Sequence, residues 1–359
     1  MSSHYIPEIG PATDQSIETA QLRLKQCGEA GLFRHAIAET FAGLGDGFAD
    51  LCRDHEQLGK QTRDPGLILA INAHIWGSIF PLLRFGSDNQ KAELLPKLVT
   101  GELIGGHAIT EPQAGSDTQA MQATAVITED GYILNGCKRY ITNTPIADLL
   151  VVYAKHEGAI SAFVVSRADP GVNFADGPIV QGCATATMGD IVLSDCRIPS
   201  DRLLGKAGMG SIMIQLALEL ERAFIFSGIA GVMQWQLDEV VTFARTRQVK
   251  GAPLCENQAI SHRIAEMKLR LETVRLWVAK CADHCDRSKR ITVESAATKW
   301  YASEAFLNSC LDSVQVFGTR GLEGEHVALV QDAMAGRLFS GSTEIQKNII
   351  AAMLGMGAD

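Results

Sequence analysis

The chain changes its hydrophobic periodicity twice, and this change constrains its fold more than any other feature. Apolar residues have helical spacing from residue 15 to about residue 100, alternate in short runs over 104–205, and return to helical spacing after 210. Spacing of three to four residues predicts helices, whereas strict alternation predicts strands. The sequence therefore predicts an α+β protein in which a β domain separates two helical parts.

Particular segments sharpen this prediction. The run LILAINAHIWGSIFPLLRFG (67–86) is almost wholly apolar and predicts a buried helix, kinked at Pro81. In the β part, Asp130-Gly131 and Asn135-Gly136 have the composition of hairpin turns. We expect each pair to connect two strands.

Composition excludes several classes of protein. A hydrophobic content of 46% and a charged content of 20% over 359 residues suit a folded protein of two or three domains. The net charge of −9, without a Lys/Arg run, argues against a nucleic-acid partner. The start MSSHYIPEIG lacks the features of a signal peptide, and we find no apolar stretch long enough to span a membrane. We therefore expect a cytoplasmic protein whose nine cysteines are reduced thiols.

Cys281 and Cys285 flank His284 and are the residues most suggestive of a metal site. They lie in one predicted helix, and no second ligand pair follows. Structural zinc sites use four ligands. We therefore expect no bound metal.

One acid interrupts an apolar face of the first long C-terminal helix. Glu221 shares that face with Ile214, Ala217, Phe224 and Gly228. A carboxylate among apolar neighbours holds a proton more readily than one in water, which suits a general base. The simpler alternative is a salt bridge between Glu221 and a neighbour. Glu219 lies beside polar residues and is expected on a polar face.

The segment GRLFSGSTEIQK (336–347) places small polar residues before a helix-like tail. Such a loop lets backbone N–H groups approach a ligand closely, and it can also simply cap the helix that follows. Ser340 alone supplies neither an acid nor a base. If a reaction occurs at this loop, another residue must take the proton.

Four segments together resemble the acyl-CoA dehydrogenase family of flavoproteins. They are AITEPQAGSD (108–117), KRYITN (138–143), ERAFIFSGIAG (221–231) with NQAISHRIAEM (257–267), and QVFGTRG (315–321) with FSGSTEIQK (339–347). The resemblance implies an N-terminal helical domain (1–103), a middle β domain (104–205) and a C-terminal four-helix bundle (206–359). It also implies FAD bound between the last two domains, partly across a subunit interface, in a homo-oligomer that is typically a tetramer.

Matching positions imply roles for individual residues. The residues implied around the flavin ring are Ile109, Thr110, Ser116, Tyr140 and Thr142. Those implied at the pyrophosphate and adenosine are Arg247, Gln315, Gly318 and Gly321. Those implied in the loop that reaches the cofactor from the C-terminal side are Ser342, Glu344 and Gln346. Hydroxyls can reach the flavin edge, and a guanidinium suits phosphate.

The adenosine end departs from the family pattern. Lys250-Gly251 stands where the family usually has Phe-Gly, and Gly318-Thr319 where it has Gly-Gly. These departures are expected to reshape that end without removing Arg247 as the phosphate partner.

The resemblance also implies a catalytic base. Many members carry a catalytic Glu at the position of Ser340, whereas a smaller branch places it on the long helix, immediately before an Arg, as in Glu221-Arg222. Glu221 would then remove the α-proton of an acyl thioester while a hydride passes from the β carbon to flavin N5. The Ser340 backbone N–H would donate to the thioester oxygen as enolate charge develops.

Segments such as FGSDNQKAELLPKLVTGELI and SHRIAEMKLRLE look most like the branch that oxidises substrates on acyl or peptidyl carrier proteins, of the prolyl-carrier-protein dehydrogenase type. This implies a carrier-bound short acyl or aminoacyl thioester, with O₂ or an electron-transfer flavoprotein as acceptor. Arg84, Lys91 and Lys97 could form a basic docking patch or could be ordinary solvated helix charges.

Three alternatives stay open. The first is a short- or branched-chain acyl-CoA dehydrogenase acting on a CoA ester. The second is oxidation of a hydroxyacyl carrier protein to a carbonyl. The third, from another class, is a flavin-free scaffold or binding protein, which the missing Glu at Ser340 motivates and which Glu221 and the retained FAD positions oppose.

Overall fold

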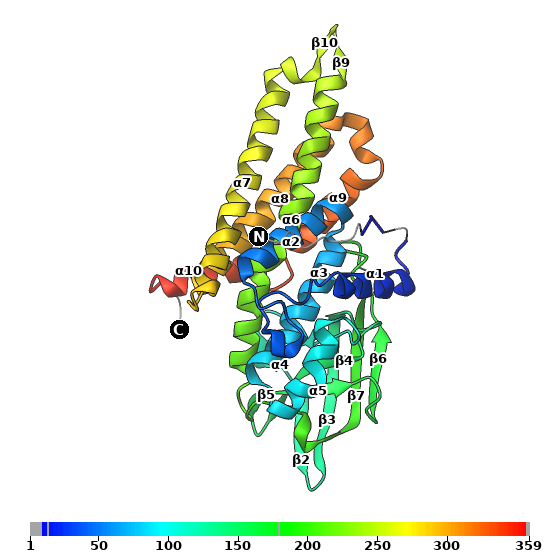
Figure 1. The fold of residues 1–359 in the computed structure, drawn as a ribbon, viewed down its shortest axis with the longest axis vertical. Coiled ribbons are helices and arrows are strands. Elements are labelled where there is room, and N and C mark those ends of the chain that lie inside the picture. The colour runs from blue at the N-terminus through cyan, green and yellow to red at the C-terminus, as the bar shows by residue number, and fades with distance from the viewer. Residues whose placement is uncertain (1–8, 13, 179, 357–359) are drawn as a thin grey trace.

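The computed structural model describes residues 9–356 except 13 and 179, so most of the segment used for the signal-peptide prediction lies outside it. Figure 1 shows a β-sheet domain at one end, long helices that extend away from it, and the N-terminal helices between the two. The N-terminal helices are α1 (Ile17–Glu29), α2 (Phe48–Thr62), α3 (Pro65–His74), α4 (Phe80–Phe85) and α5 (Asp88–Val99). The succession of helices, a sheet and again helices along the chain confirms the predicted α+β class.

The apolar stretch forms one buried, interrupted helix, as predicted. Between α3 and α4 the chain makes a π-helical turn, η2 (Ile75–Ile79). Proline lacks an N–H and its ring clashes with the carbonyl four residues earlier, so a wider turn before Pro81 accommodates it. Contrary to our expectation, the helix Pro65–Phe85 is long and apolar enough to cross a membrane, but 89% of its apolar 18-residue stretch is buried inside the protein, as in a core helix.

The middle part is one mixed sheet whose strand order is β6-β7-β3-β2-β4-β5-β8, with β1 pairing in parallel with β4. Its strands are β1 (His107–Ala108), β2 (Thr124–Thr128), β3 (Gly131–Thr142), β4 (Leu149–His156), β5 (Ala159–Ser166), β6 (Val172–Asp176), β7 (Met188–Pro199) and β8 (Leu203–Leu204). β4 is buried along nearly its whole length and forms the centre of this domain's core.

The two predicted turns have different outcomes. Asp130-Gly131 does connect two strands, with Thr128 paired to Gly131. Asn135-Gly136 does not: it lies inside β3 at a shift of register against β7. A Cβ on Gly136 would lie 2.7 Å from the Ala123 Cβ, so the glycine serves the close approach of two backbone segments at a bulge.

The C-terminal part is built on α6 (Gly210–Thr246), α7 (Gln258–Asp286), α8 (Thr292–Phe317), α9 (Glu325–Gly336) and α10 (Thr343–Met353). A small hairpin, β9 (Gln248–Val249) and β10 (Ala252–Pro253), lies at the far tip of the long helices (Figure 1). Lys250 and Gly251 both have positive φ, at 52° and 81°, as the tight turn between two such strands requires. The Lys-Gly departure is therefore compatible with a hairpin.

Candidate active site

Glu221 lies in the N-terminal half of α6 and is 4% exposed. The apolar face predicted around it is confirmed, because the four residues assigned to that face are buried: Ile214, Ala217, Phe224 and Gly228. The Ser340 hydroxyl donates to Glu221 Oε1 at 2.6 Å. His107 Nε2 lies 3.5 Å from Glu221 Oε2, and this oxygen has no hydrogen-bond partner among the described residues.

The expectation for Glu219 is wrong. Instead of facing solvent, it is 6% exposed and accepts hydrogen bonds from Arg290 Nε (3.1 Å), the Ile291 N–H (2.9 Å) and the Thr292 hydroxyl (2.9 Å). Burial opposes its charge, but these donors outweigh burial and lower the pKa of Glu219. Of these two carboxylates, Glu219 is thus the one paired with an arginine, and Glu221 is the one on the apolar face.

The loop that carries Ser340 is held by side-chain donors. Ser340 has a left-handed backbone (φ 53°), and its carbonyl accepts from Arg222 Nε at 2.9 Å. Lys299 Nζ donates to the Arg337 carbonyl at 2.8 Å, and burial lowers the pKa of Lys299 to about 7. The Ser340 N–H itself donates to no group within the described chain. It is therefore available to an incoming carbonyl oxygen.

Four of the predicted flavin residues lie at β1 and β3 of the sheet domain, on segments that contact each other. Ile109 and Thr110 directly follow β1, the strand that contains His107, and the Thr110 carbonyl accepts from the Arg139 N–H at 2.9 Å. Tyr140 has a φ of 57° beside a register shift in β3 and is 50% exposed, although large aromatic residues normally avoid both conditions. Such strain is typical of functional sites. Thr142 ends β3 two residues later.

A buried ion pair shapes this loop. Lys138 is fully buried and its Nζ donates to Glu111 Oε1 (2.8 Å) and to the Ile109 carbonyl (3.1 Å). Glu111 also accepts from the N–H groups of Gln122 (2.6 Å) and Ala123 (3.0 Å). Glu111, near the start of the segment between β1 and β2, thus accepts hydrogen bonds from the backbone at the end of the same segment.

These residues fit a flavin. An exposed aromatic ring next to hydroxyls suits one face and edge of an isoalloxazine. Two buried polar atoms of this region, Thr187 Oγ1 and Gln346 Oε1, have no hydrogen-bond partner in the part of the chain described here, and flavin polar atoms could supply one. Ile109, Thr110, Tyr140 and Thr142 would hold the ring.

The remaining residues of the C-terminal loop differ in their surroundings. Gln346 is fully buried and its Nε2 donates to the carbonyls of Gly341 (2.8 Å) and Ser340 (3.3 Å), so it supports the loop. Ser342 is the N-cap residue of α10, and Glu344 is exposed in its first turn. Ser116 is exposed in the β1–β2 segment. Their roles toward the cofactor stay predictions.

The predicted adenosine residues form a second, distant group. Arg247 caps the end of α6, while Gln315, Gly318 and Gly321 lie at the end of α8. The rings of Phe243 and Phe317, with centroids 4.6 Å apart, hold these two helix ends together. Arg247 is 26 residues beyond Glu221 on one helix, about 39 Å at a rise of about 1.5 Å per residue. Within one chain, the predicted adenosine residues therefore lie far from Glu221.

Sequence reasoning missed several residues around the site. His107, Lys138 and Lys299 were not singled out, because each contacts the site through partners far away in sequence. Lys299 stands between small and aromatic residues in AATKWYA, which was the only available signal, and Lys138 in GCKRY gave none.

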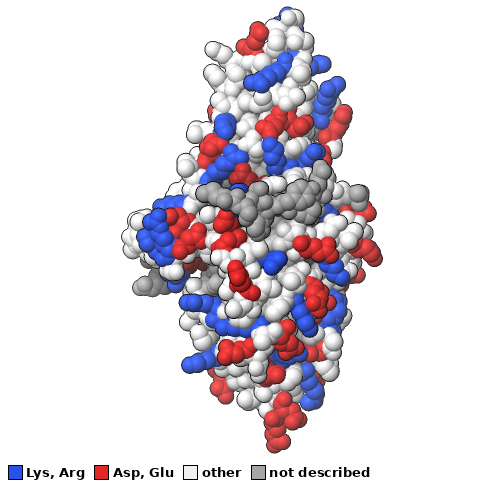
Figure 2. Space-filling model, viewed as in Figure 1, with Lys and Arg blue, Asp and Glu red and all other residues white. Residues whose placement is uncertain are grey.

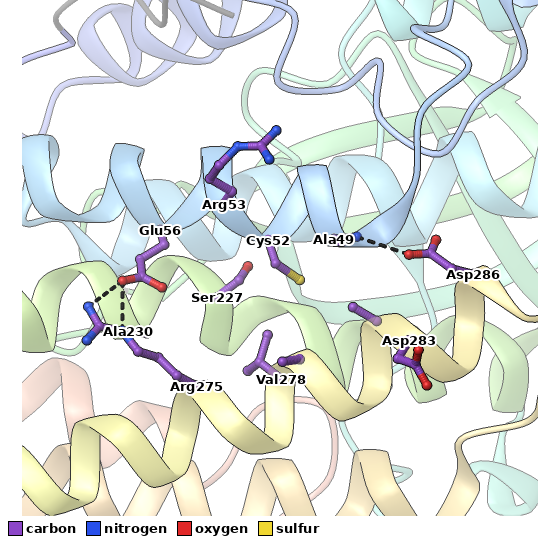
Figure 3. A pocket seen from close by; sticks show the side chains of 12 residues that line it. Ala49, Cys52, Arg53, Glu56, Ser227, Ala230, Arg275, Val278, Asp283 and Asp286 are labelled. Carbon is purple, nitrogen blue, oxygen red and sulfur yellow. Dashed lines mark hydrogen bonds and ion pairs between the residues drawn. The ribbon is translucent and has the colours of Figure 1, made fainter. Parts of the chain in front are cut away.

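A separate cavity of about 370 Å³ lies between α2, α6 and α7 (Figure 3). Cys52, Ser227 and Val278 line it, and Arg275 pairs with Glu56 at its edge. It contains neither Glu221 nor any predicted cofactor residue. It is thus distinct from the candidate active site.

Comparison with known proteins agrees with this architecture. Residues 3–102, 106–196 and 208–355 match the N-terminal, middle and C-terminal domains of acyl-CoA dehydrogenase, respectively. L-prolyl-peptidyl-carrier-protein dehydrogenase from Pseudomonas fluorescens is 37% identical over 337 residues, which cover 91% of this chain and 88% of that protein. The mitochondrial short-chain specific acyl-CoA dehydrogenase of Rattus norvegicus is 33% identical, with 92% and 82% covered.

A solved structure described as PigA with FAD and proline superposes with a TM-score of 0.90 at 34% identity, covering 96% of this chain and 94% of that chain. Both the sequence and the fold thus match over nearly the whole length. The three domain matches in family order make this chain a member of the acyl-CoA dehydrogenase family, whose enzymes are FAD-dependent dehydrogenases.

Proposed function

We propose that this enzyme oxidises a short acyl or aminoacyl thioester carried by an acyl or peptidyl carrier protein, with Glu221 as the base. The observation that carries the proposal is that the two carboxylate oxygens of Glu221 have different surroundings. Oε1 is held by Ser340, whereas Oε2 has no hydrogen-bond partner among the described residues and is free to take a proton. Its burial on an apolar face keeps water from competing for that proton.

In this proposal Glu221 Oε2 removes the α-proton of the thioester. The Ser340 N–H donates to the thioester oxygen as enolate charge develops, and Arg222 holds the Ser340 carbonyl so that this N–H is preoriented. FAD, whose ring Ile109, Thr110, Tyr140 and Thr142 would hold, would supply the acceptor for the hydride equivalent that leaves the β carbon. Ser340 needs no acidic side chain, because the acid of this loop is supplied from α6.

The carrier-protein substrate is supported by the similarity to the P. fluorescens dehydrogenase. The short-chain acyl-CoA dehydrogenase is also similar, which keeps a CoA ester as the second candidate. Arg84 on α4 and Lys97 on α5 are both exposed, and neither forms an ion pair within the described residues. They would contact an acidic carrier protein. Elsewhere, acidic and basic side chains are interspersed on the face in Figure 2.

The two distant groups of cofactor residues support a shared site. We propose that the flavin end binds near Glu221 of one subunit and that Arg247, Gln315, Gly318 and Gly321 of another subunit hold the adenosine end. Large apolar side chains stay exposed on the outer helices, among them Leu276 (71%), Leu354 (67%) and Trp300 (37%). Exposed apolar side chains such as these favour association, here into a homodimer or homotetramer.

The cytoplasm is the proposed location, since none of the nine cysteines, all of which lie in the described part of the chain, forms a disulfide. The acceptor for the electrons is O₂ or an electron-transfer flavoprotein. Oxygen uptake during turnover would identify the first of these.

The deciding experiment offers the same acyl group to the purified yellow holoenzyme as a carrier-protein thioester and as a CoA thioester. Prolyl, butyryl and 3-hydroxybutyryl groups form the panel, and mass spectrometry identifies the product. The proposal expects faster turnover on the carrier protein and loss of two hydrogens between the α and β carbons. Faster turnover of the CoA ester, or a 3-oxo product, would favour the corresponding alternative. A colourless protein that takes up no FAD would contradict the proposal altogether.

A further inference from the structure

We infer that His107 is a positioning residue for Glu221: a neutral imidazole whose Nε2–H points at Oε2 and, together with Ser340 on Oε1, fixes the orientation of the base. The inference rests on the proposed function, since it assumes that Glu221 takes the proton. Its own evidence is the geometry of three side chains from three separate elements.

The first observation is the contact itself. His107 Nε2 and Glu221 Oε2 lie 3.5 Å apart, and their side chains are only 14% and 6% exposed. This separation is slightly long for a hydrogen bond, so a small movement on substrate binding would close it. Neutral donors on a carboxylate orient it and stabilise its charged form.

The second observation concerns the state of the ring. Burial lowers the pKa of His107, although the Glu221 charge opposes this effect. The imidazole is therefore neutral near pH 7 and carries one N–H. Among the described residues, Glu221 is the carboxylate that faces this ring, and Nδ1 is buried without a hydrogen-bond partner. The tautomer with the proton on Nε2 is the one that serves the carboxylate.

The third observation is that the backbone is shaped around this histidine. A Cβ on Gly77 would lie 2.8 Å from the His107 N and 3.0 Å from its Cγ, so only glycine leaves room for His107 there. Gly77 belongs to the π turn η2, and π turns are frequent at functional sites. In the same turn, the ring of Trp76 packs on that of Phe224, one turn from Glu221, with centroids 5.6 Å apart.

Other charged groups near Glu221 are already engaged. On α6, Arg222 donates to the Ser340 carbonyl and Glu219 is bound by Arg290. From α8 and the C-terminal loop, Lys299 donates to the Arg337 carbonyl, and Arg337 pairs with Glu304. The turn η2 contributes no charged residue. His107 is thus the titratable side chain that faces the free oxygen of the base.

The test compares three substitutions on the FAD-loaded enzyme. His107→Phe keeps a ring but removes both nitrogens. His107→Gln places an amide N–H near the position of Nε2, whereas His107→Asn places it near Nδ1. For each variant we would measure the rate of anaerobic flavin reduction as a function of pH. Without substrate, infrared spectroscopy would follow the protonation of Glu221 through the carboxyl band that is missing in Glu221→Gln.

We expect the acidic limb of the pH profile and the infrared midpoint to move up by about one pH unit in His107→Phe and His107→Asn, because the carboxylate loses a donor. His107→Gln should restore both to within a few tenths of a unit. At pH well above the limb, flavin reduction should still be slower than wild type in His107→Phe and His107→Asn, because Glu221 loses one of the two groups that orient it, whereas His107→Gln should come close to the wild-type rate.

Unchanged profiles in His107→Phe, or equal rescue by Gln and Asn, would overturn the inference. If His107→Phe fails to bind FAD, the difference in pH profile between His107→Gln and His107→Asn still tests the inference. Glu221→Gln distinguishes failure of the proposed function from failure of this inference. If Glu221→Gln reduces flavin at the normal rate, the proposed function is wrong. If Glu221→Gln is inactive and the His107 variants keep the wild-type pH profile, only the role of His107 is wrong.

Discussion

Lys138 offers the sharpest test of how the flavin-side loop is built. Lys138→Met keeps the length and most of the volume of the side chain but removes its charge and its donors. Glu111 would then stay buried with a negative charge, and the Ile109 carbonyl would lose the ammonium that now donates to it. The loop between β1 and β2 carries Ile109 and Thr110, so both stability and FAD binding should respond.

The magnitude follows from the contacts. Removing one partner of a buried ion pair costs about 3–5 kcal/mol. Glu111 keeps the N–H groups of Gln122 and Ala123 as donors, so we expect the lower end, about 3 kcal/mol. For 359 residues the unfolding entropy is about 0.75 kcal/mol/K, so the Tm should fall by about 4 °C.

The assay is thermal unfolding at pH 7 and one fixed scan rate, with FAD affinity measured alongside. Burial lowers the pKa of Lys138 to about 8, so the wild-type ammonium is mostly charged at pH 7. The matched control is the double variant Lys138→Met with Glu111→Gln. It removes the unpaired negative charge of Glu111 and should recover about half of the fall in Tm. A Tm within 1 °C of wild type for Lys138→Met, or no recovery in the double variant, would refute the reasoning.

Three further predictions address the loop and the base. Ser340→Ala removes the donor on the carboxylate and should slow flavin reduction about tenfold, measured by stopped flow; an unchanged rate would mean that the hydroxyl only fills space. Gly77→Ala should displace His107 and lower activity while FAD content is retained, whereas Gly10→Ala, with open space around it, should be neutral in the same assays. Because burial lowers the folded-state pKa of Lys299 to about 7, the unfolded state binds more protons between about pH 7 and 10.5. The unfolding free energy of the wild type should therefore rise with pH relative to Lys299→Met, and parallel curves in denaturant titrations would contradict this.

The sequence could predict those features that depend on local patterns. The buried helix around Pro81, the hairpin at Asp130-Gly131 and the apolar face around Glu221 follow from periodicity, turn chemistry and helix geometry. Each depends on residues within one or two turns of one another. Such short-range rules need no knowledge of the tertiary fold.

The features that could not be predicted depend on contacts between distant segments. Asn135-Gly136 has the composition of a turn, but pairing along β3 turns it into a bulge. Glu219 lies beside polar residues in sequence, yet Arg290, just before α8, donates to it and offsets the cost of burying its charge. His107 gave no signal, since its partner Glu221 lies on another domain's helix. The roles assigned to the cofactor residues stay predictions.

The most direct test of the account is anaerobic flavin reduction by the wild type and Glu221→Gln with a prolyl carrier-protein thioester. The substituted amide keeps the shape of the side chain and can still interact with Ser340, but it cannot take a proton. We predict that the wild-type flavin bleaches, and that Glu221→Gln binds FAD and the thioester without bleaching. Bleaching of Glu221→Gln at the wild-type rate would contradict the assignment of Glu221 as the base.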